Sequence, residues 1–336
     1  MRLGVTPPVE VAGFPAAVDV CVRAEGLGYT DVWTAEIGAV DAFSPLAAVA
    51  TRTAAVRLGT ALVPVFTRPP ALVAMGAAGI QNLSGGRFVL GIGASSPAIV
   101  GRWMGIPFED PVARVEEYVA LLRDMLAGRK VDHDGRTVRT HGFRLQIGVD
   151  APVPIHVGAL GPRMCRLAGR VADGVLFFLM TPDGVRQALA EVHVGAREAG
   201  RDPAEIEAFI RLPVSMGEPE ETARFMARRM LTGYAIVPAY NASLARQGYA
   251  AEAGEIAGRW AAGERDRAAQ AFSDDLLDAT FLLGDARTSN RRIAEYRDAG
   301  ITTPVLMPVS VAGSSEERAV RVRALVEALA PGRSAA

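Results

Sequence analysis

The chain has 336 residues, of which 50% are hydrophobic and 22% are charged, and its formal net charge is −1. This composition excludes a disordered chain, which would contain fewer apolar residues and carry more net charge. The near balance of charge argues against a nucleic-acid-binding protein, which needs a basic excess to neutralise phosphates. The two cysteines, Cys21 and Cys165, are too few for a disulfide framework or a four-ligand zinc site.

No targeting or membrane segment is predicted. The first eight residues contain no long apolar stretch and fit a short strand followed by a turn, so we expect no signal peptide. Every apolar run of 18 residues is interrupted by glycine, proline or charge, so we expect no transmembrane helix and no membrane partner. Because two thiols fit a reducing compartment, the predicted location is cytoplasmic.

One pattern recurs along the chain: a short apolar strand, a loop of small residues and an amphipathic helix. Strands are predicted at residues 3–6, 31–34, 56–65, 87–91, 154–157, 173–178, 206–214 and 303–309. Helices are predicted at residues 12–27, 43–53, 68–83, 111–126, 162–171, 182–199, 219–231, 250–260, 264–271, 288–299 and 316–329.

Eight apolar strands that alternate with helices indicate an α/β fold with a parallel sheet covered by helices. Eight such units predict a TIM (β/α)8 barrel with insertions, as a single domain over residues 1–330. The surplus length falls in residues 129–149, where Asp134-Gly135 predicts a hairpin, and in the mostly helical residues 232–286; residues 331–336 form a tail. A doubly wound sheet is the alternative, but it would carry a glycine-rich phosphate loop after the first strand, and Thr6-Pro7-Pro8 is not one.

The loop at residues 158–163 is the most informative candidate site, because barrel sites form from the loops that follow the strands. Gly158 and Gly161 allow the backbone to approach a ligand closely, and Pro162 suits the first position of a helix. The free N–H groups at that helix start, together with the guanidinium of Arg163, predict a phosphate site. A plain strand-to-helix turn is the other interpretation.

Other candidate residues are more ambiguous. Glu36 follows a strand and could bind a ligand, act as an acid, or be an exposed loop carboxylate. For His156, inside a strand, a buried core position is favoured over a functional one. The segment from Gly91 to Ser96 begins like a dinucleotide fingerprint but lacks the third glycine, which favours a close approach to a flat ligand. Because no metal-ligand spacing or nucleophile elbow occurs, no metal is predicted and an organic cofactor is implied.

Four segments resemble the luciferase-like monooxygenase family, in particular its branch that uses the deazaflavin coenzyme F420 and includes methylenetetrahydromethanopterin reductase-like proteins. The run from Ser84-Gly85-Gly86-Arg87 into Leu90-Gly91-Ile92-Gly93 is the most specific of them. The four segments are residues 28–36, residues 57–64 with 67–70, residues 83–93, and residues 157–162 with 168–174.

The resemblance implies a TIM barrel, usually a homodimer, with the deazaflavin ring across the barrel mouth. It places a bulge with a non-proline cis peptide near Ala61-Leu62, behind the ring, and a phosphate on the 158–163 loop. The implied cofactor-binding residues are Ala61, Leu62, Val63, Gly93, Ala94, Ser95, Val157, Gly158, Ala159, Leu160, Gly161, Pro162, Arg163, Met180 and Thr181.

The sequence departs from the family pattern at two positions. The common Asp-His pair after the second strand is replaced by Glu36-Ile37, and the catalytic glutamate of the sugar-phosphate dehydrogenases is replaced by Ser96. We therefore expect a reductase that acts on a small organic substrate, with Glu36 as the remaining proton donor or acceptor. An FMN-dependent monooxygenase of the same superfamily and a cofactor-binding barrel without catalysis are the alternatives. Phe66, Ser96, Trp103 and Phe178 are expected to line the substrate site, whose specificity we assign to residues 94–110 and 232–286.

Overall fold

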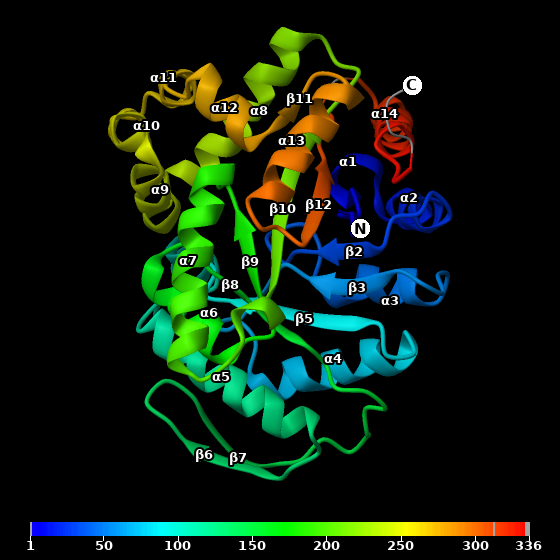
Figure 1. Ribbon diagram of the computed structural model, residues 1–336, viewed down its shortest axis with the longest axis vertical. Coiled ribbons are helices and arrows are strands. Elements are labelled where there is room, and N and C mark those ends of the chain that lie inside the picture. Colours follow the sequence, from blue (N-terminus) through cyan, green and yellow to red (C-terminus); the bar gives the residue numbers. More distant parts are fainter. Residues whose placement is uncertain (1, 312, 333–336) are drawn as a thin grey trace. The chain divides into compact units, whose positions relative to one another are not determined.

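The structure is a computed structural model that describes residues 2–311 and 313–332. The chain forms two compact units that interleave along the sequence, and each has its own parallel strands and helices (Figure 1). The first unit comprises Met1–Tyr29, Phe177–Ala190 and Ala208–Ala336, and the second comprises Thr30–Leu176 and Glu191–Glu207.

The second unit contains parallel strands in the order β2-β3-β5-β8-β9. The register places Val32 beside Leu58 and Ile92 beside Val157, so the strands run side by side with their carboxyl ends at one edge. Every residue of β2 and β5 is buried, as expected for parallel strands covered by helices. The strands are β2 (Asp31–Thr34), β3 (Arg57–Thr60), β4 (Val63–Pro64), β5 (Phe88–Gly93), β8 (Ile155–Gly158) and β9 (Gly174–Phe178), whose last two residues belong to the first unit.

Helices follow these strands at nearly the predicted positions, because their apolar residues recur at helical spacing and proline occupies the first turn of several of them. A π-helix, η1, was not predicted. The helical elements are α3 (Phe43–Ala50), α4 (Pro70–Leu83), η1 (Ala98–Trp103), α5 (Pro111–Leu126), α6 (Pro162–Val171), α7 (Pro182–Glu198), which begins in the first unit, and the short η2 (Pro203–Glu205).

The hairpin predicted within residues 129–149 is confirmed. Strands β6 (Val131–Asp134) and β7 (Arg139–Phe143) pair antiparallel beyond α5, apart from the parallel sheet (Figure 1). The carboxylate of Glu117 on α5 accepts hydrogen bonds from the backbone N–H groups of Arg136, Thr137 and Val138, which fixes the turn of the hairpin to α5.

The strand predicted over residues 56–65 is interrupted, and this prediction was wrong in its length. β3 ends at Thr60, the peptide bond between Ala61 and Leu62 is cis, and β4 begins at Val63 and pairs with β5. The apolar pattern gave no sign of the break, whereas the family resemblance implied a cis bond at this place. Leu62 therefore lies between the end of β3 and the start of β4 and belongs to neither strand.

The first unit contains parallel strands in the order β11-β10-β12-β1. Arg211 of β10 and Gly4 of β1 both pair with Val305 of β12, which lies between them. The strands are β1 (Gly4–Val5), β10 (Glu207–Ser215), β11 (Leu282–Leu283) and β12 (Thr303–Pro308), and the helices that lie outside residues 220–280 are α1 (Val9–Ala12), α2 (Phe14–Gly26), α13 (Ala286–Asp298) and α14 (Ser315–Ala328).

Residues 232–286 are mostly helical, as predicted, and form a group of short helices beside α8 (Figure 1). They pack through one apolar cluster that includes Phe178 of β9, Leu244, Phe272 and Leu276, and Met307 of β12 lies against it. The insertion therefore covers residues at the carboxyl ends of β9 and β12. The helix α8 (Glu220–Ala235) begins before the insertion and ends within it, and the helices of the insertion proper are α9 (Pro238–Leu244), η3 (Ala245–Tyr249), α10 (Ala250–Ala261), α11 (Arg265–Gln270) and α12 (Asp274–Thr280).

The alternation of parallel strands and helices in chain order agrees with the predicted (β/α)8 pattern. Within residues 2–311 and 313–332, no helix is long and apolar enough to cross a membrane. The organisation as a single domain over residues 1–330 stays a prediction. Of the predicted tail, residues 333–336 lie outside the described residues.

Candidate active site

The second unit brings most of the predicted cofactor residues together at one edge of its sheet. Residues 61–63 lie at the junction of β3 and β4, residues 93–95 follow β5, and residues 157–163 end β8 and begin α6. Pro64 pairs with Gly93, and the N–H of Val65 donates to the carbonyl of Gly93 at 2.9 Å, so the first two segments are in direct contact. β5 pairs in turn with β8. In parallel α/β folds ligands bind at this carboxyl edge.

The side chain of Leu62 fills the space between two glycines of this edge. A Cβ atom added to Gly93 would lie 2.5 Å from Leu62 Cδ2, and one added to Gly158 would lie 2.4 Å from the same atom. Real Cβ atoms do not approach so closely, so an alanine at either position would force the end of the Leu62 side chain to move. That Gly158 also serves a close approach of ligand to backbone stays a prediction.

The amino end of α6 presents unsatisfied donors, as the sequence predicted. Gly161 precedes the helix, Pro162 is its first residue, and no side chain caps it. Within the part of the chain that the structure describes, the N–H groups of Arg163 and Met164 donate to no acceptor. Because the positive end of the helix dipole lies at the same place, these donors fit an anion such as phosphate.

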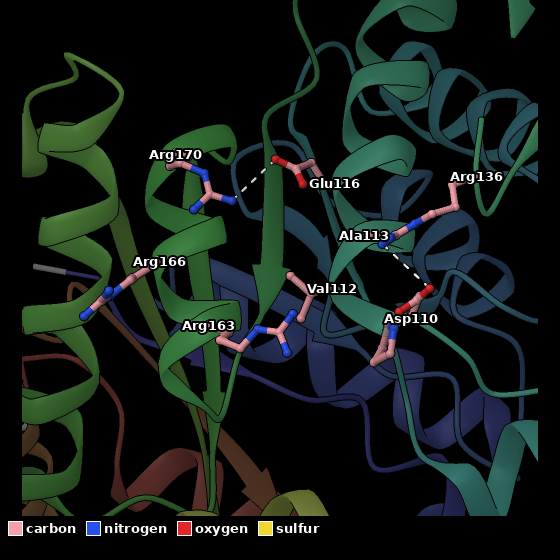
Figure 2. Close-up of a pocket in the computed structure, with 9 residues that line it drawn as sticks. Asp110, Val112, Ala113, Glu116, Arg136, Arg163, Arg166 and Arg170 are labelled. Carbon is pink, nitrogen blue, oxygen red and sulfur yellow. Dashed lines mark hydrogen bonds and ion pairs between the residues drawn. The ribbon is translucent and has the colours of Figure 1, made fainter. Parts of the chain in front are cut away.

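A cavity of about 390 Å³ lies along α6, facing the start of α5, and is lined by four arginines from α6 and the hairpin turn. Figure 2 shows Arg163 pointing from α6 toward Val112 on α5, whereas Arg166 points away from it. Arg166 is bound to Glu191, and Arg170 lies 3.4 Å from Glu116. The fourth arginine, Arg136, lies 3.7 Å from Asp110. Among the described residues, Arg163 is the arginine of this cavity that has no carboxylate or carbonyl partner.

Glu36 is held in a paired and half-buried position in the loop after β2. Its Oε1 accepts from Arg68 Nε at 2.8 Å, and its Oε2 accepts from Arg68 Nη2 at 2.8 Å and from the N–H of Ala42 at 3.1 Å. The side chains of Glu36 and Arg68 are 18% and 22% exposed, and the hydrogen bonds to Glu36 raise the pKa of Arg68. The interpretation as an exposed loop carboxylate was wrong. A proton-donor role for Glu36 requires this bidentate pair to open.

Three of the predicted substrate residues lie in the second unit. Phe66 is buried and stacks on Phe108 with ring centroids 4.8 Å apart. Ser96 is buried, and its hydroxyl accepts from the N–H of Ile99 at 3.3 Å at the start of η1. Trp103 is 58% exposed and lies against Gly38, in the loop that carries Glu36. Of the three, Trp103 presents a broad apolar surface that is free to contact a ligand.

The loop after β9 belongs to the first unit and carries Phe178, Met180 and Thr181. Tyr296 of α13 donates to the carbonyl of Met180 at 2.7 Å. Gln247 of η3 accepts from the N–H of Thr181 at 2.8 Å, and the Thr181 hydroxyl accepts from the N–H of Gly184 at the start of α7. The loop is thus fixed by α13 and by the insertion, and its contact with a cofactor stays a prediction.

His156 occupies a buried core position, as predicted. Its ring stacks on Trp33 with centroids 5.7 Å apart, and its Nε2 lies 3.6 Å from Glu207 Oε2. Burial lowers the pKa of His156 to about 4, although the charge of Glu207 acts in the opposite direction. The ring is therefore neutral near pH 7 and forms part of the strand packing.

One residue that sequence reasoning missed is Arg211 of β10, which is buried and has no acidic partner among the described residues. The sequence contains a signal for this residue, because Arg211 is a charged residue within the otherwise apolar run of residues 208–214. In the described ranges, no group of three or more histidine, cysteine or carboxylate side chains is placed to hold a metal ion.

The chain is similar in sequence to members of one known protein family. A model of the luciferase-like monooxygenase family matches residues 1–303. The chain is 31% identical to the 5,10-methylenetetrahydromethanopterin reductase of Methanolobus tindarius over 303 residues, which cover 89% of this chain and 91% of the relative. It is 30% identical over 344 residues to a Mycobacterium tuberculosis protein assigned as a coenzyme F420-dependent oxidoreductase, with 94% of each chain covered.

A solved structure resembles the chain along almost its whole length. The coenzyme F420-dependent tetrahydromethanopterin reductase of Methanopyrus kandleri superposes with a TM-score of 0.79 at 24% identity, covering 98% of this chain and 97% of that one. At this identity the likeness shows the fold alone, which is the TIM barrel expected from the sequence.

Proposed function

Because the chain belongs to the luciferase-like monooxygenase family, we propose that it is an oxidoreductase that uses coenzyme F420 and acts on a small organic substrate. The relatives described above, at 30% and 31% identity over most of their length, support F420 in preference to FMN. When bound, the deazaflavin ring supplies a carbon that donates or accepts a hydride. The residues of this chain bind and orient it.

One observation carries the proposal: the amino end of α6 has free N–H groups at Arg163 and Met164, beside an Arg163 guanidinium without a partner among the described residues. These donors would hold the phosphate of the cofactor. The edge formed by Leu62, Gly93 and Gly158 would lie behind the ring, since these residues share the same strand ends. Such a division between a phosphate site and a flat apolar support suits a flavin-like molecule.

A reductase is favoured over an alcohol dehydrogenase by the chemistry of the remaining groups. Oxidation of an alcohol needs a free base for the hydroxyl proton. Here Ser96 hydrogen-bonds the start of η1, and both oxygens of Glu36 are engaged by Arg68 and Ala42. Reduction of an activated double bond depends less on a base than alcohol oxidation does, because no hydroxyl proton has to be removed in the step that moves the hydride.

The cofactor assignment is tested by titrating the purified full chain with F420 and with FMN, each in the oxidised and the reduced form. We expect F420 to bind at least tenfold more tightly than FMN, and the reduced complex to consume no oxygen. Tight FMN binding with oxygen consumption would instead support the monooxygenase alternative. If neither molecule binds, the proposal is wrong and the barrel has another ligand or none.

The phosphate site is tested with two arginines on one helix. Arg163→Gln removes the unpartnered guanidinium, and we expect it to weaken F420 binding about ten- to a hundredfold, because a charge-assisted hydrogen bond contributes roughly 1.5–3 kcal/mol. Arg166→Gln is the matched control, since Arg166 points away and is bound to Glu191 (Figure 2). Equal affinities of the two variants would exclude Arg163 from the phosphate site.

We also infer a homodimer that forms through α4. The exposed face of this helix carries Leu72, Met75 and Leu83, which are 44%, 49% and 47% exposed, with Gly79 between them. An apolar stripe of this kind on a surface helix is unfavourable in water and fits a self-complementary interface between two copies. The cytoplasmic location stays a prediction from the sequence.

A further inference from the structure

The Arg211 side chain is a nearly buried cation without a counter-charge. Its guanidinium nitrogens are not among the fully buried side-chain atoms of the described residues that lack a partner, so they reach a solvent-accessible space. The residue lies in the middle of β10 and is 7% exposed, and its guanidinium forms no hydrogen bond or ion pair with any residue in the described ranges. By contrast, the half-buried Arg57 and Arg68 are each bound to carboxylates. A guanidinium stays charged at every physiological pH, and burying a charge without an acceptor is unfavourable. Because no described residue supplies an acceptor, the guanidinium takes its acceptor from water or from a ligand that displaces the water.

The Arg211 guanidinium lies over one aromatic ring, which in turn contacts two others. The guanidinium carbon lies 5.0 Å from the centroid of the Phe178 ring. That ring contacts Tyr234 edge-on at 4.7 Å and Tyr240 at 6.1 Å, and the two tyrosines lie 5.5 Å apart. We call Arg211, Phe178, Tyr234 and Tyr240 the Arg211 cluster. Two of its members come from strands, and the two tyrosines come from α8 and α9 at the insertion.

The cluster offers hydrogen-bond donors and no anion. Neither the Tyr234 nor the Tyr240 hydroxyl bonds to another described residue. Burial raises the pKa of Tyr240, while the positive charge of Arg211 opposes that rise, so the Tyr240 phenol remains protonated. A fixed positive charge with phenol donors beside it recognises an anionic oxygen, and the ring faces accommodate a flat or apolar body. An ammonium ligand is disfavoured, because Arg211 would repel it.

The location of the cluster fits a substrate site. Phe178 is the last residue of β9 and directly precedes the loop of Met180 and Thr181, which α13 and η3 hold in place. In a barrel, the groups that follow strand ends act on the ligand. The tyrosines come from the part of the chain to which substrate specificity was assigned, residues 232–286.

We propose that the Arg211 cluster binds a carboxylate or phosphate group of the organic substrate, with the rings of Phe178, Tyr234 and Tyr240 against the adjoining carbon skeleton. This inference rests on the proposed function, because it assigns the occupant as the molecule that the oxidoreductase acts on. Arg211 and the two hydroxyls form the recognition groups. The substrate is accordingly an organic acid or a phosphate ester.

The test uses three probes that share one ring: benzoate, phenyl phosphate and the neutral benzamide. Their dissociation constants for the full chain are measured by ligand-detected NMR, which reads millimolar affinities. We expect benzoate or phenyl phosphate to bind at least tenfold more tightly than benzamide, and the better of the two identifies the anionic group. Equal binding of all three probes overturns the proposal.

Arg211→Gln is expected to abolish the preference for the anionic probes and to leave benzamide unchanged. The matched control is Arg229→Gln: Arg229 also stacks on a phenylalanine, Phe225, at 5.7 Å, but on the exposed face of α8. We expect Arg229→Gln to bind the probes like the parent chain. An anion preference that survives in Arg211→Gln overturns the proposal.

Two further variants distinguish a lost anion site from a misfolded chain. Tyr240→Phe keeps the ring and removes one donor, and we expect it to weaken binding of the preferred anion three- to tenfold. Arg211→Met removes the unpaired charge, and we expect it to raise the unfolding temperature of the ligand-free chain. Full anion affinity in Tyr240→Phe, or a lowered unfolding temperature in Arg211→Met, counts against the cluster as an anion site.

F420 binding is measured on the same samples to separate the two proposals. If F420 binds and the anion preference is absent, this inference fails alone. If the anion preference is present and F420 does not bind, the proposed function fails and the assignment of the occupant as its substrate fails with it.

Discussion

At the scale of single residues, the pairing of Glu36 with Arg68 makes the predicted role of Glu36 testable. Glu36→Gln keeps the shape of the side chain and removes its charge. If Glu36 transfers a proton, we expect turnover to fall about 100-fold, the usual contribution of a positioned acid or base. The pair also fixes the loop at Ala42, so the unfolding free energy should drop by about 1 kcal/mol.

Steady-state kinetics and urea unfolding of Glu36→Gln and Arg68→Gln distinguish the two roles. Arg68→Gln opens the pair but leaves the carboxylate, so a proton-transferring Glu36 predicts a much smaller kinetic effect for this variant. Equal losses of turnover in both variants would show that the pair only positions the loop. Full turnover in Glu36→Gln would exclude Glu36 as the acid.

A second residue-scale prediction concerns acid stability. The pKa of His156 is about 4 in the folded chain, because burial disfavours the charged ring, against 6.5 for a free histidine. Between these two values the unfolded chain binds a proton and the folded chain does not. Stability contributed by the neutral ring is thus fully present above about pH 6.5, declines as the pH falls toward 4, and changes no further below it.

The expected loss is about 2 kcal/mol between pH 7 and pH 5. Urea unfolding at the two pH values measures it. His156→Gln should show a smaller difference between the two pH values, although it is less stable at both because the packing on Trp33 is lost. His141→Gln, which changes an exposed histidine of the hairpin, is the control. An unchanged pH dependence in His156→Gln would contradict the assignment.

At the scale of elements, the contact of Leu62 with Gly93 and Gly158 couples the ends of β4, β5 and β8. Gly158→Ala places a methyl group where Leu62 Cδ2 already lies, so we expect a loss of about 1–3 kcal/mol in unfolding free energy. The double variant with Leu62→Ala should recover part of this loss, because the obstruction is removed. Thermal and urea unfolding of the single and double variants measure the coupling.

Gly254→Ala is the control for this experiment. Gly254 lies within α10 with nothing near its Cβ position, so alanine should stabilise the chain by up to about 1 kcal/mol. If Gly158→Ala changed the unfolding free energy in the same way as Gly254→Ala, the contact with Leu62 would not contribute to stability.

At the scale of the whole molecule, the apolar stripe of α4 predicts self-association. Leu72→Asp with Met75→Glu puts two charges on the stripe, and we expect the dimer to dissociate at micromolar concentration, since each buried large apolar side chain contributes roughly 1.5–3 kcal/mol. Light scattering coupled to size-exclusion chromatography measures the mass. Phe225→Glu, at an equally exposed aromatic residue of α8, should leave the dimer intact. A monomeric parent chain would refute the interface.

The sequence alone predicted most strands and helices to within a few residues, because continuous apolar strands and helical periodicity are local signals. It also predicted the uncapped helix start after residues 158–161, since glycine and proline act there through backbone geometry. It did not predict the pairing of Glu36 with Arg68 or the Arg211 cluster. Both depend on residues that are distant in sequence: Tyr234 and Tyr240 meet Phe178 only through the packing of the insertion.

The contact of Leu62 with Gly93 and Gly158 has a consequence for the sequences of related proteins. Positions 62, 93 and 158 share one volume, so a larger residue at either glycine position favours a smaller residue at 62. Across family members these three positions should vary together, as a correlated set. A family member that changed one position alone would have a differently shaped surface at this edge of the sheet.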